Sequence, residues 1–326
     1  MTVSVALATY NGEKFLKMQL DSLLNSTRQP DEVVIIDDCS TDGTAEYLKG
    51  YIAEHNLNWK FSVSKSNSGY KRNFYNCLQE CTGDVIFLCD QDDVWYSEKI
   101  EKVTEIFEND VKVLGVNTSF DMIDADGNML VPFSNGKNTA NHGLIKIGIS
   151  EGEVATVKLG TLLQYNISPG CTCAFRREVV SEYLKTSKCM MPHDWELNIV
   201  AASKDGLRFF NKPFIGYRQH GNNTIGLSVN DSFGPLNFRG DTDVRFEVLK
   251  MQISQRDINI AFCDRENDEQ VNFLKKLDAF CKNREKILYE KRFFPCVKNF
   301  FVYPYLKNVA TIHFRGLLGD ILFVLR

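Results

Sequence analysis

Three carboxylates crowd into four residues where an apolar run of the chain ends. Residues 85–88 (V-I-F-L) and Cys89 are followed by Asp90, Gln91, Asp92 and Asp93. Like charges packed this closely repel one another unless a cation or hydrogen-bond donors lie among them. A divalent metal ion suits such oxygen ligands, whereas an acidic turn capping a helix that starts near residue 97 is the alternative. The segment by itself leaves both interpretations open.

A second acidic segment follows another apolar run upstream. Residues 32–36 lead into Asp37 and Asp38, and a polar loop then precedes a helix that begins near Thr44. Like the first segment, it follows the carboxyl end of an expected strand, the edge at which open α/β sheets bind ligands. Helix capping is the alternative for Asp37 and Asp38, although Asp42 is the better cap candidate.

The first hundred residues alternate between buried strands and amphipathic helices. Strands are expected at 3–8, 32–36, 59–64 and 85–88, with helices between them. This βαβ series predicts a parallel sheet with right-handed crossovers. Neither G-x-G-x-x-G after the first strand nor G-x-x-x-x-G-K-[ST] occurs in the chain. A bound diphosphate would therefore need another counter-charge, which a metal on the acidic turn would supply.

The second half continues with less regular elements. The sequence predicts a hairpin turn at 124–128, a short strand at 169–175 and a helix at 176–184. A helix is expected at 197–203, with Pro192 on the approach to its start. Strands at 207–210 and 215–218 then close the domain, and the loop after them places His220 at an edge.

The sequence pattern changes at about Asp241. From there the pattern is helical, and neither Pro nor Gly occurs until Pro295. The last 42 residues hold seven Lys and Arg against three acids, whereas the rest of the chain has a net charge of −8. These basic residues are mixed with aromatic ones, which favours a helix lying on an anionic membrane face. Packing against the main domain or a second subunit is the alternative.

Composition sets further bounds. A net charge of −4 over 326 residues gives no case for nucleic-acid binding. The ten cysteines are scattered without a C-x-x-C pair, so we expect free thiols. The opening apolar run is too short for a signal peptide, and no run of about twenty apolar residues is present. We therefore expect a cytoplasmic protein.

Taken together, the motifs of residues 3–226 resemble the family 2 nucleotide-sugar glycosyltransferases of the GT-A fold, in their bacterial rhamnosyltransferase-like branch. The matching segments are 5–12 (V-A-L-A-T-Y-N-G), 34–44 (V-I-I-D-D-C-S-T-D-G-T), 67–69 (N-S-G), 90–95 (D-Q-D-D-V-W), 193–195 (H-D-W) and 217–223 (Y-R-Q-H-G-N-N). The resemblance implies an α/β, Rossmann-like, mostly parallel sheet flanked by helices. It implies a GT-A domain at 1–240, with a nucleotide-binding half at 1–95 and an acceptor and catalytic half at 96–240, and a helical region at 241–326.

The resemblance also implies roles for individual residues. Asp194 matches the catalytic base, and Asp92 and His220 match metal ligands for Mg²⁺ or Mn²⁺. Donor-binding residues would be Thr9, Tyr10, Asn11, Asp37, Asp38, Asn67, Gly69, Lys71, Asp90, Gln91 and Arg218. Acceptor-side residues would be Asp93, Trp95, Cys171, Thr172, His193 and Trp195, with Asp93 next to either the metal or the sugar.

The implied reaction is an inverting, metal-dependent transfer of L-rhamnose from dTDP-L-rhamnose to a lipid-linked saccharide acceptor in cell-surface polysaccharide synthesis. A UDP-hexose or UDP-N-acetylhexosamine donor is the alternative within the fold, and a non-catalytic nucleotide-sugar-binding scaffold is the alternative outside the enzyme class. The Q-x-x-R-W signature of processive synthases is missing, so one sugar per encounter is expected. We further expect peripheral contact with the inner face of the cell membrane, and a homodimer remains open.

Overall fold

The protein's structure is a computed structural model that describes residues 1–131, 149–163, 166–220, 242–263, 265–306, 309, 312 and 314–325. The chain forms two compact units, Met1–Val157 with Asn166–Leu227, and Lys158–Tyr165 with Ser228–Arg326. The predicted boundary at residue 240 lies outside the described residues and stays a prediction. Residues 158–165 belong to the second unit, whereas the sequence analysis assigned them to the first domain.

The first unit begins with four parallel strands in the order β3-β2-β1-β4. Its elements are β1 (Val3–Thr9), α1 (Glu13–Leu24), β2 (Glu32–Asp37), α2 (Thr44–Glu54), β3 (Lys60–Val63), α3 (Tyr70–Glu80) and β4 (Val85–Cys89). The predicted βαβ series is confirmed. β1 and β4 are buried along their whole length, as expected for parallel strands that are covered on both faces.

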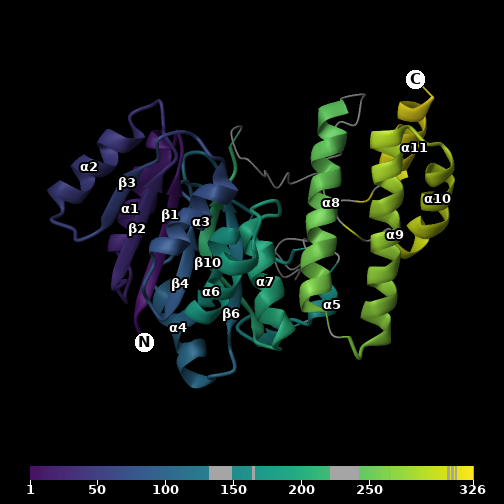
Figure 1. The fold of residues 1–326 in the computed structure, drawn as a ribbon. Helices are drawn as coiled ribbons and strands as arrows, with labels where there is room; N and C mark the ends of the chain where they lie inside the picture. The colour runs from purple at the N-terminus through teal and green to yellow at the C-terminus, as the bar shows by residue number, and fades with distance from the viewer. Residues whose placement is uncertain are drawn as a thin grey trace. The chain divides into compact units, whose positions relative to one another are not determined.

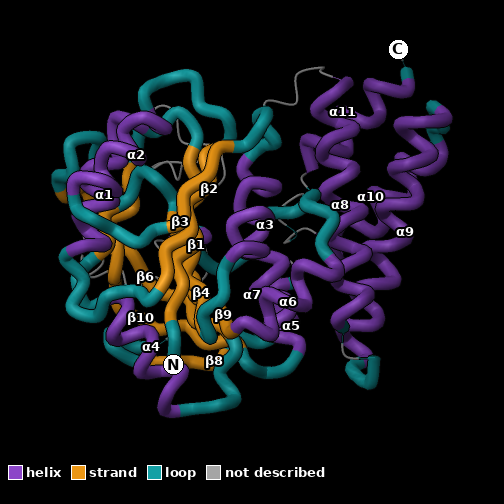
Figure 2. The backbone as a smooth tube through the Cα atoms, turned by 60° about the vertical axis from the view of Figure 1, so that its left-hand side comes forward, coloured by secondary structure: helices purple, strands orange, loops and turns teal. Residues whose placement is uncertain are grey.

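The helices divide between the two faces of this sheet. From β1 the chain moves outward through β2 to β3, and then returns to β4 on the other side of β1. Because each crossover is right-handed, this reversal places α3 on the face opposite α1 and α2. Figure 2 shows α1 and α2 on one side of the strands and α3, α6 and α7 on the other. The reversal creates a topological switch point between β1 and β4, where open α/β sheets bind ligands.

The rest of the first unit extends the sheet in the order β9-β6-β10-β5. Its elements are β5 (Val94–Trp95), α4 (Lys99–Asn109), β6 (Gly115–Ile123), β7 (Met129–Val131), β8 (Val154–Thr156), a 3₁₀ turn (Gly170–Thr172), β9 (Cys173–Arg176), α6 (Arg177–Thr186), α7 (His193–Ser203) and β10 (Leu207–Arg218). β9 is antiparallel to both β4 and β6, whereas β10 is parallel to β6. The predicted α/β fold with a mostly parallel central sheet is therefore confirmed.

Two predicted boundaries in this half are wrong. The helix expected at Leu197 begins four residues earlier, at His193, with Pro192 as its N-cap. Nearly every residue of α7 is buried, so the segment lacks the polar face that marks a helix in a sequence. The two strands expected on either side of Pro213 are one strand, β10, which accommodates the proline through shifts in its register against β6.

The second unit is helical, which agrees with the helical region predicted from residue 241 onward. It contains α5 (Leu159–Leu162), α8 (Thr242–Phe262), α9 (Asp268–Glu290), α10 (Phe294–Leu306) and α11 (Phe314–Val324). A buried ion network ties three of these helices, because Asp320 of α11 accepts from Arg245 of α8 at 2.8 Å and from Arg284 of α9 at 3.0 Å. Among the described residues, no helix is both long and apolar enough to cross a bilayer.

Candidate active site

Three loops of the first unit meet at the carboxyl edge of the parallel strands. Thr9 lies opposite Asp37 in the β1–β2 register, and Leu7 lies opposite Cys89 in the β1–β4 register. The loops after β1 and β2 and the acidic turn after β4 therefore leave the sheet side by side (Figure 1). This edge brings together the two acidic segments that the sequence analysis singled out.

Asp37 and Asp38 hold neighbouring loops in place. The Thr9 hydroxyl donates to Asp37 Oδ1 at 3.0 Å, and the Ser40 backbone N–H donates to Asp37 Oδ2 at 2.8 Å. Asp38 accepts from the backbone N–H groups of Ser68 and Gly69. Both carboxylates are buried, so they shape the floor of the edge from below. Their contact with a nucleoside stays a prediction.

The loop after β1 is locked from two sides. The Gln91 amide accepts from the Tyr10 N–H at 2.8 Å and donates to the Tyr10 carbonyl at 2.9 Å. Gly12 leaves space for this amide, because a Cβ atom there would collide with it. Asn11 has a left-handed φ of 48°, and its Oδ1 accepts from the Thr41 N–H. The Tyr10 backbone and the Asn11 and Gln91 side chains therefore fix the loop, and the predicted contact of these residues with the donor stays a prediction.

Arg218, the last residue of β10, supports the acidic turn from inside. Its Nε donates to the Asp92 carbonyl at 2.6 Å, and its backbone N–H donates to Asp93 Oδ1 at 3.0 Å. The guanidinium also donates to the carbonyls of Asp124 and Ala125 in the predicted hairpin turn. The side chain is fully buried and positions the turn, and its predicted contact with the donor stays a prediction.

The two predicted metal ligands lie next to each other. His220 Nε2 is 2.8 Å from Asp92 Oδ2, and the imidazole stacks on Phe15 with ring centroids 4.5 Å apart. His220 is therefore brought from far along the chain to the acidic turn. The ligand role of this pair stays a prediction.

A second group of candidate metal ligands lies deeper. One ligand atom each from Asp90, Asp93 and Cys171 fall within 4.8 Å of one another. Burial, and then the charges of Asp93 and Asp92, raise the pKa of Asp90 well above its usual value. Burial and Asp92 raise the pKa of Asp93 to about 7, and its Oδ2 has no N–H or O–H partner in the described structure. A divalent cation would relieve this repulsion, so the carboxylates fit Mg²⁺ or Mn²⁺.

A buried lysine partly offsets the acids. Lys99 is fully buried, donates from Nζ to the Cys171 carbonyl, and lies 3.5 Å from the centroid of the Trp95 ring. Burial lowers the pKa of Lys99 to about 8, so most molecules keep this positive charge at neutral pH.

Asp194 faces the same site from the first turn of α7. Asn166 donates from Nδ2 to Asp194 Oδ2 at 2.6 Å, and burial raises the pKa of Asp194 to about 6. Burial, followed by the charges of Asp194 and Asp90, raises the pKa of the Tyr70 hydroxyl above its usual value. Tyr70 therefore lies within electrostatic reach of both acids, and the predicted base and the acidic turn belong to one site.

The predicted acceptor-side residues around Asp194 are buried. The His193 ring stacks on Phe74 with centroids 3.9 Å apart, and neither ring nitrogen has a hydrogen-bond partner among the described residues. Trp95, Thr172 and Trp195 are also buried. These side chains form the supporting wall of the site, and their contact with an acceptor stays a prediction.

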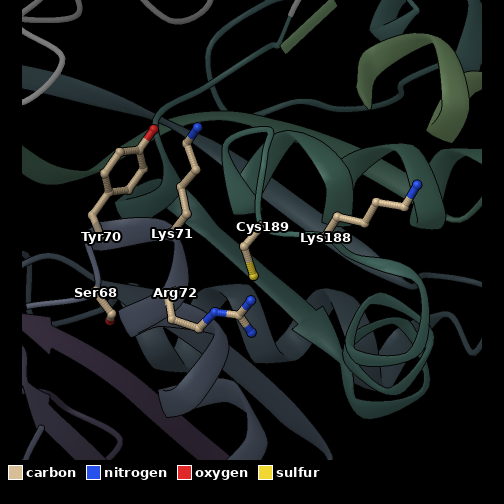
Figure 3. Close-up of a pocket in the computed structure, with 7 residues that line it drawn as sticks. Ser68, Tyr70, Lys71, Arg72, Lys188 and Cys189 are labelled. Carbon is tan, nitrogen blue, oxygen red and sulfur yellow. The ribbon is translucent and has the colours of Figure 1, made fainter. Parts of the chain in front are cut away.

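A pocket of about 310 Å³ opens at the N-terminus of α3 (Figure 3). Its lining comprises Ser68, Gly69, Tyr70, Lys71, Arg72, Lys188 and Cys189. The Lys71 and Tyr70 side chains extend in the same direction in Figure 3, and Lys71 Nζ donates to the Met190 carbonyl. Asn67 Oδ1 accepts from the Gly69 N–H and closes this loop. Three cationic side chains beside a helix N-terminus suit an anion, as predicted for Asn67, Gly69 and Lys71.

Sequence reasoning missed three residues of this site. Tyr70 adjoins the predicted Gly69 and Lys71, but nothing in its spacing singles it out. Lys99 precedes the buried Val103 and Phe107 at intervals of four, so its position on an apolar helix face was a usable signal. Asn166 lies in an irregular stretch and carries no sequence signal.

Comparisons with known proteins agree with this geometry. A family model described as Glycosyl transferase family 2 matches residues 4–184. The chain is 26% identical to dTDP-rhamnosyl transferase RfbG of Shigella flexneri over 241 residues, which cover 68% of this chain and 74% of that protein. It is 31% identical to the putative glycosyltransferase EpsE of Bacillus subtilis over 125 residues, which cover 38% of this chain and 45% of that protein.

Solved structures share the fold. A fragment of S. aureus TarS in complex with UDP-GlcNAc is 16% identical with a TM-score of 0.57, and the match covers 99% of this chain and 89% of that one. The match to another TarS chain covers 88% of this chain but only 44% of that one. Mannosyltransferase PcManGT of Pyrobaculum calidifontis, in complex with GDP-Man and Mn²⁺, is 16% identical with a TM-score of 0.53, covering 99% and 86%.

The buried histidine generates a prediction about stability. Burial lowers the pKa of His193 to about 3, so between pH 6.5 and pH 4 the unfolded chain takes up a proton that the folded chain does not. As the pH falls from 7 to 4, the free energy of unfolding of wild type should therefore decrease by up to about 3 kcal/mol more than that of His193→Phe. Urea unfolding at both pH values measures the difference.

Trp195→Phe is the matched control, because it alters a buried ring beside His193 without removing a titratable group. Its difference from wild type should be equal at the two pH values. A constant gap between His193→Phe and wild type would contradict a neutral, buried imidazole.

Proposed function

Because the chain belongs to glycosyl transferase family 2, we propose that it catalyses an inverting, metal-dependent transfer of a sugar from a nucleotide-diphosphate donor to a saccharide acceptor. The observation that carries this proposal is the meeting of Asp90 and Asp93 with Asp194 at the carboxyl edge of the sheet. Asp90 and Asp93 can hold a metal ion and the donor, and Asp194 can accept a proton. A scaffold that only binds nucleotide sugar would need no such base.

We propose dTDP-L-rhamnose as the donor. The support is the sequence similarity to a relative named as a dTDP-rhamnosyl transferase, at 26% identity over 68% of this chain. A UDP-hexose or UDP-N-acetylhexosamine is the competing donor, since a structural neighbour at 16% identity is described in complex with UDP-GlcNAc. The nucleoside would lie over the floor that Thr9, Asp37 and Asp38 hold in place.

In this reaction Asp194 acts as the general base. Its carboxylate accepts the proton of the acceptor hydroxyl while that oxygen attacks the anomeric carbon from the face opposite the leaving diphosphate, which inverts the configuration. With a pKa of about 6, the group is ionised at neutral pH and still basic enough to accept the proton. Tyr70 lies near Asp194 and Asp90 and helps to enclose the reacting groups.

The acidic turn serves the leaving group. Asp90 and Asp93 would hold Mg²⁺ or Mn²⁺ together with Asp92 and His220, and the bound ion would neutralise charge that grows on the departing diphosphate. Lys71 and Arg72 at the start of α3 add positive charge on the neighbouring pocket. The missing Q-x-x-R-W signature supports transfer of one sugar per encounter.

A donor screen with and without metal tests the function. Purified full-length chain should release nucleoside diphosphate from dTDP-L-rhamnose in the presence of Mg²⁺ or Mn²⁺, and chelation with EDTA should lower the rate at least about a hundredfold. Restoring Mn²⁺ should restore the rate. Release from UDP-sugars alone would overturn the rhamnose assignment, and no release from any donor with any saccharide acceptor would favour the scaffold.

Replacement of the base gives a sharper result. Asp194→Asn should lower kcat about a thousandfold or more while donor affinity, measured by calorimetry, stays within about threefold. For wild type, kcat should fall as the pH drops below about 6, because protonation of Asp194 removes the base. Glu178→Gln, on the first turn of the neighbouring helix α6, is the control and should behave as wild type. Unchanged turnover in Asp194→Asn would exclude this residue from the mechanism.

We also propose that the acceptor is lipid-linked and that the second unit lies against the inner face of the cell membrane. On α10, Phe294, Val297, Phe301 and Tyr305 recur at helical spacing and are all exposed, with Phe294 80% and Phe301 77% exposed. On α11, Phe314, Leu318 and Leu322 form a second exposed row. The basic side chains Lys291, Arg292 and Lys298 are exposed near these rows. Aromatic residues with a basic rim fit an anionic bilayer surface.

Vesicle binding tests this surface. The double variant Phe294→Ser with Phe301→Ser should bind vesicles containing phosphatidylglycerol at least about tenfold more weakly than wild type, because two rings no longer insert. Val111→Ser, which removes an equally exposed residue of the first unit, should bind as wild type. Unchanged vesicle binding, or loss of a dimer in place of vesicle binding, would show that these rows contact protein.

A further inference from the structure

A series of hydrogen-bonded amides runs from the middle of the sheet to Asp194. It links Asn117 of β6, Asn198 of α7 and Asn166 of the segment before the 3₁₀ turn, and Asn117 and Asn198 are completely buried. Asn166 is half-buried, and burying the other two amides is unfavourable unless their donors and acceptors are paired. In this case each amide is paired with the next.

The hydrogen bonds of this series have a fixed direction. Asn117 Nδ2 donates to Asn198 Oδ1 at 2.7 Å, and Asn198 Nδ2 donates to Asn166 Oδ1 at 2.9 Å. The backbone N–H of Ile167 also donates to Asn166 Oδ1, at 3.0 Å. With its oxygen held by two donors, the Asn166 amide must present its NH₂ group to Asp194 Oδ2, 2.6 Å away.

The bonds at Asn117, the end of the amide series farthest from Asp194, favour the same orientation of the amides. The Cys173 thiol donates to Asn117 Oδ1 at 2.9 Å, and Asn198 Nδ2 makes a second, longer bond to the same oxygen at 3.2 Å. Reversing the Asn166 amide would set its oxygen against the Asp194 carboxylate and its NH₂ against the Asn198 NH₂. Hydrogen bonds in such a buried network reinforce one another.

We propose that Asn166 is a positioning residue of the transfer reaction, and that Asn198 and Asn117 fix the orientation of its amide. The inference rests on the proposed role of Asp194 as the base. By donating to Oδ2, Asn166 holds the carboxylate plane together with the backbone N–H groups of Trp195 and Asp194, which also bond this carboxylate. A base held in one orientation avoids the rate loss that a misplacement of about 1 Å brings.

The amide also stabilises the charged form of Asp194, because it donates to the carboxylate. Loss of the Asn166 amide should make Asp194 easier to protonate. The acidic limb of the profile of kcat against pH should therefore move to higher pH. Other groups that face Asp194 remain in place in such a variant. They are Tyr70 of α3, Asp90 after β4, Cys173 of β9 and Glu196 of α7, with Lys71 of α3 next to Glu196.

The test compares Asn166→Ala, Asn198→Leu and Asp194→Asn in the full chain with the donor and acceptor that wild type uses. Asn166→Ala should lower kcat about 10- to 100-fold, leave the KM for donor within about threefold, and raise the acidic limb by about one pH unit. Asn198→Leu should lower kcat less, by about tenfold, and should raise the acidic limb by a smaller amount. If Asn166→Ala does not fold, Asn198→Leu carries the same comparison.

Asn211→Ala is the matched control. Asn211 is a buried amide of β10 that bonds Ser119 and the Ile149 carbonyl, and in the described part of the chain no hydrogen bond joins it to Asp194. Its loss should lower stability while kcat and the acidic limb stay as in wild type. If Asn166→Ala keeps the kcat and the acidic limb of wild type while Asp194→Asn is inactive, only the positioning role is overturned. Full activity in Asp194→Asn would overturn the proposed base as well.

Discussion

Repulsion among the carboxylates at the end of β4 is the constraint on which the rest of the site depends. Asp90 and Asp93 are packed into a space where burial and mutual repulsion raise their pKa values. Two buried cations compensate for part of this charge: Lys99 binds the Cys171 carbonyl and interacts with Asp93, and Arg218 binds the backbone of the turn. A bound divalent cation would offset the negative charge that remains.

The edge around the acidic turn is built before any ligand arrives. Asn11 and Cys39, in the loops after β1 and β2, have left-handed backbone conformations that few residue types adopt readily. Bonds from Thr41 to Asn11 and from Ser68 to Asp38 hold these loops against their neighbours. Polar groups that could have contacted a nucleotide are used to fix loop geometry. Such preorganisation lowers the cost of ordering a donor.

The two halves of the first unit contribute different chemistry. The parallel half supplies the acidic turn and the start of α3, whereas Asp194 comes from α7, which follows the antiparallel strand β9. Insertion of β9 between β4 and β6 brings Cys173, Asn117 and α7 together, and this arrangement makes the amide series possible. The strand order therefore sets where Asp194, the proposed base, lies relative to the acidic turn.

The sequence by itself determined the parallel half of the fold and the acids at its edge, because buried strands, amphipathic helices and acidic strand ends are local patterns. It also located Asp194, His220 and the helical second unit. Only the tertiary structure decided that Arg218 is buried, that Asp90 and Asp93 pair with Cys171, and that Asn166 holds Asp194. These facts depend on strand order and on register shifts in β10, and contacts between residues 28 to 126 positions apart leave no periodic signal in a single chain.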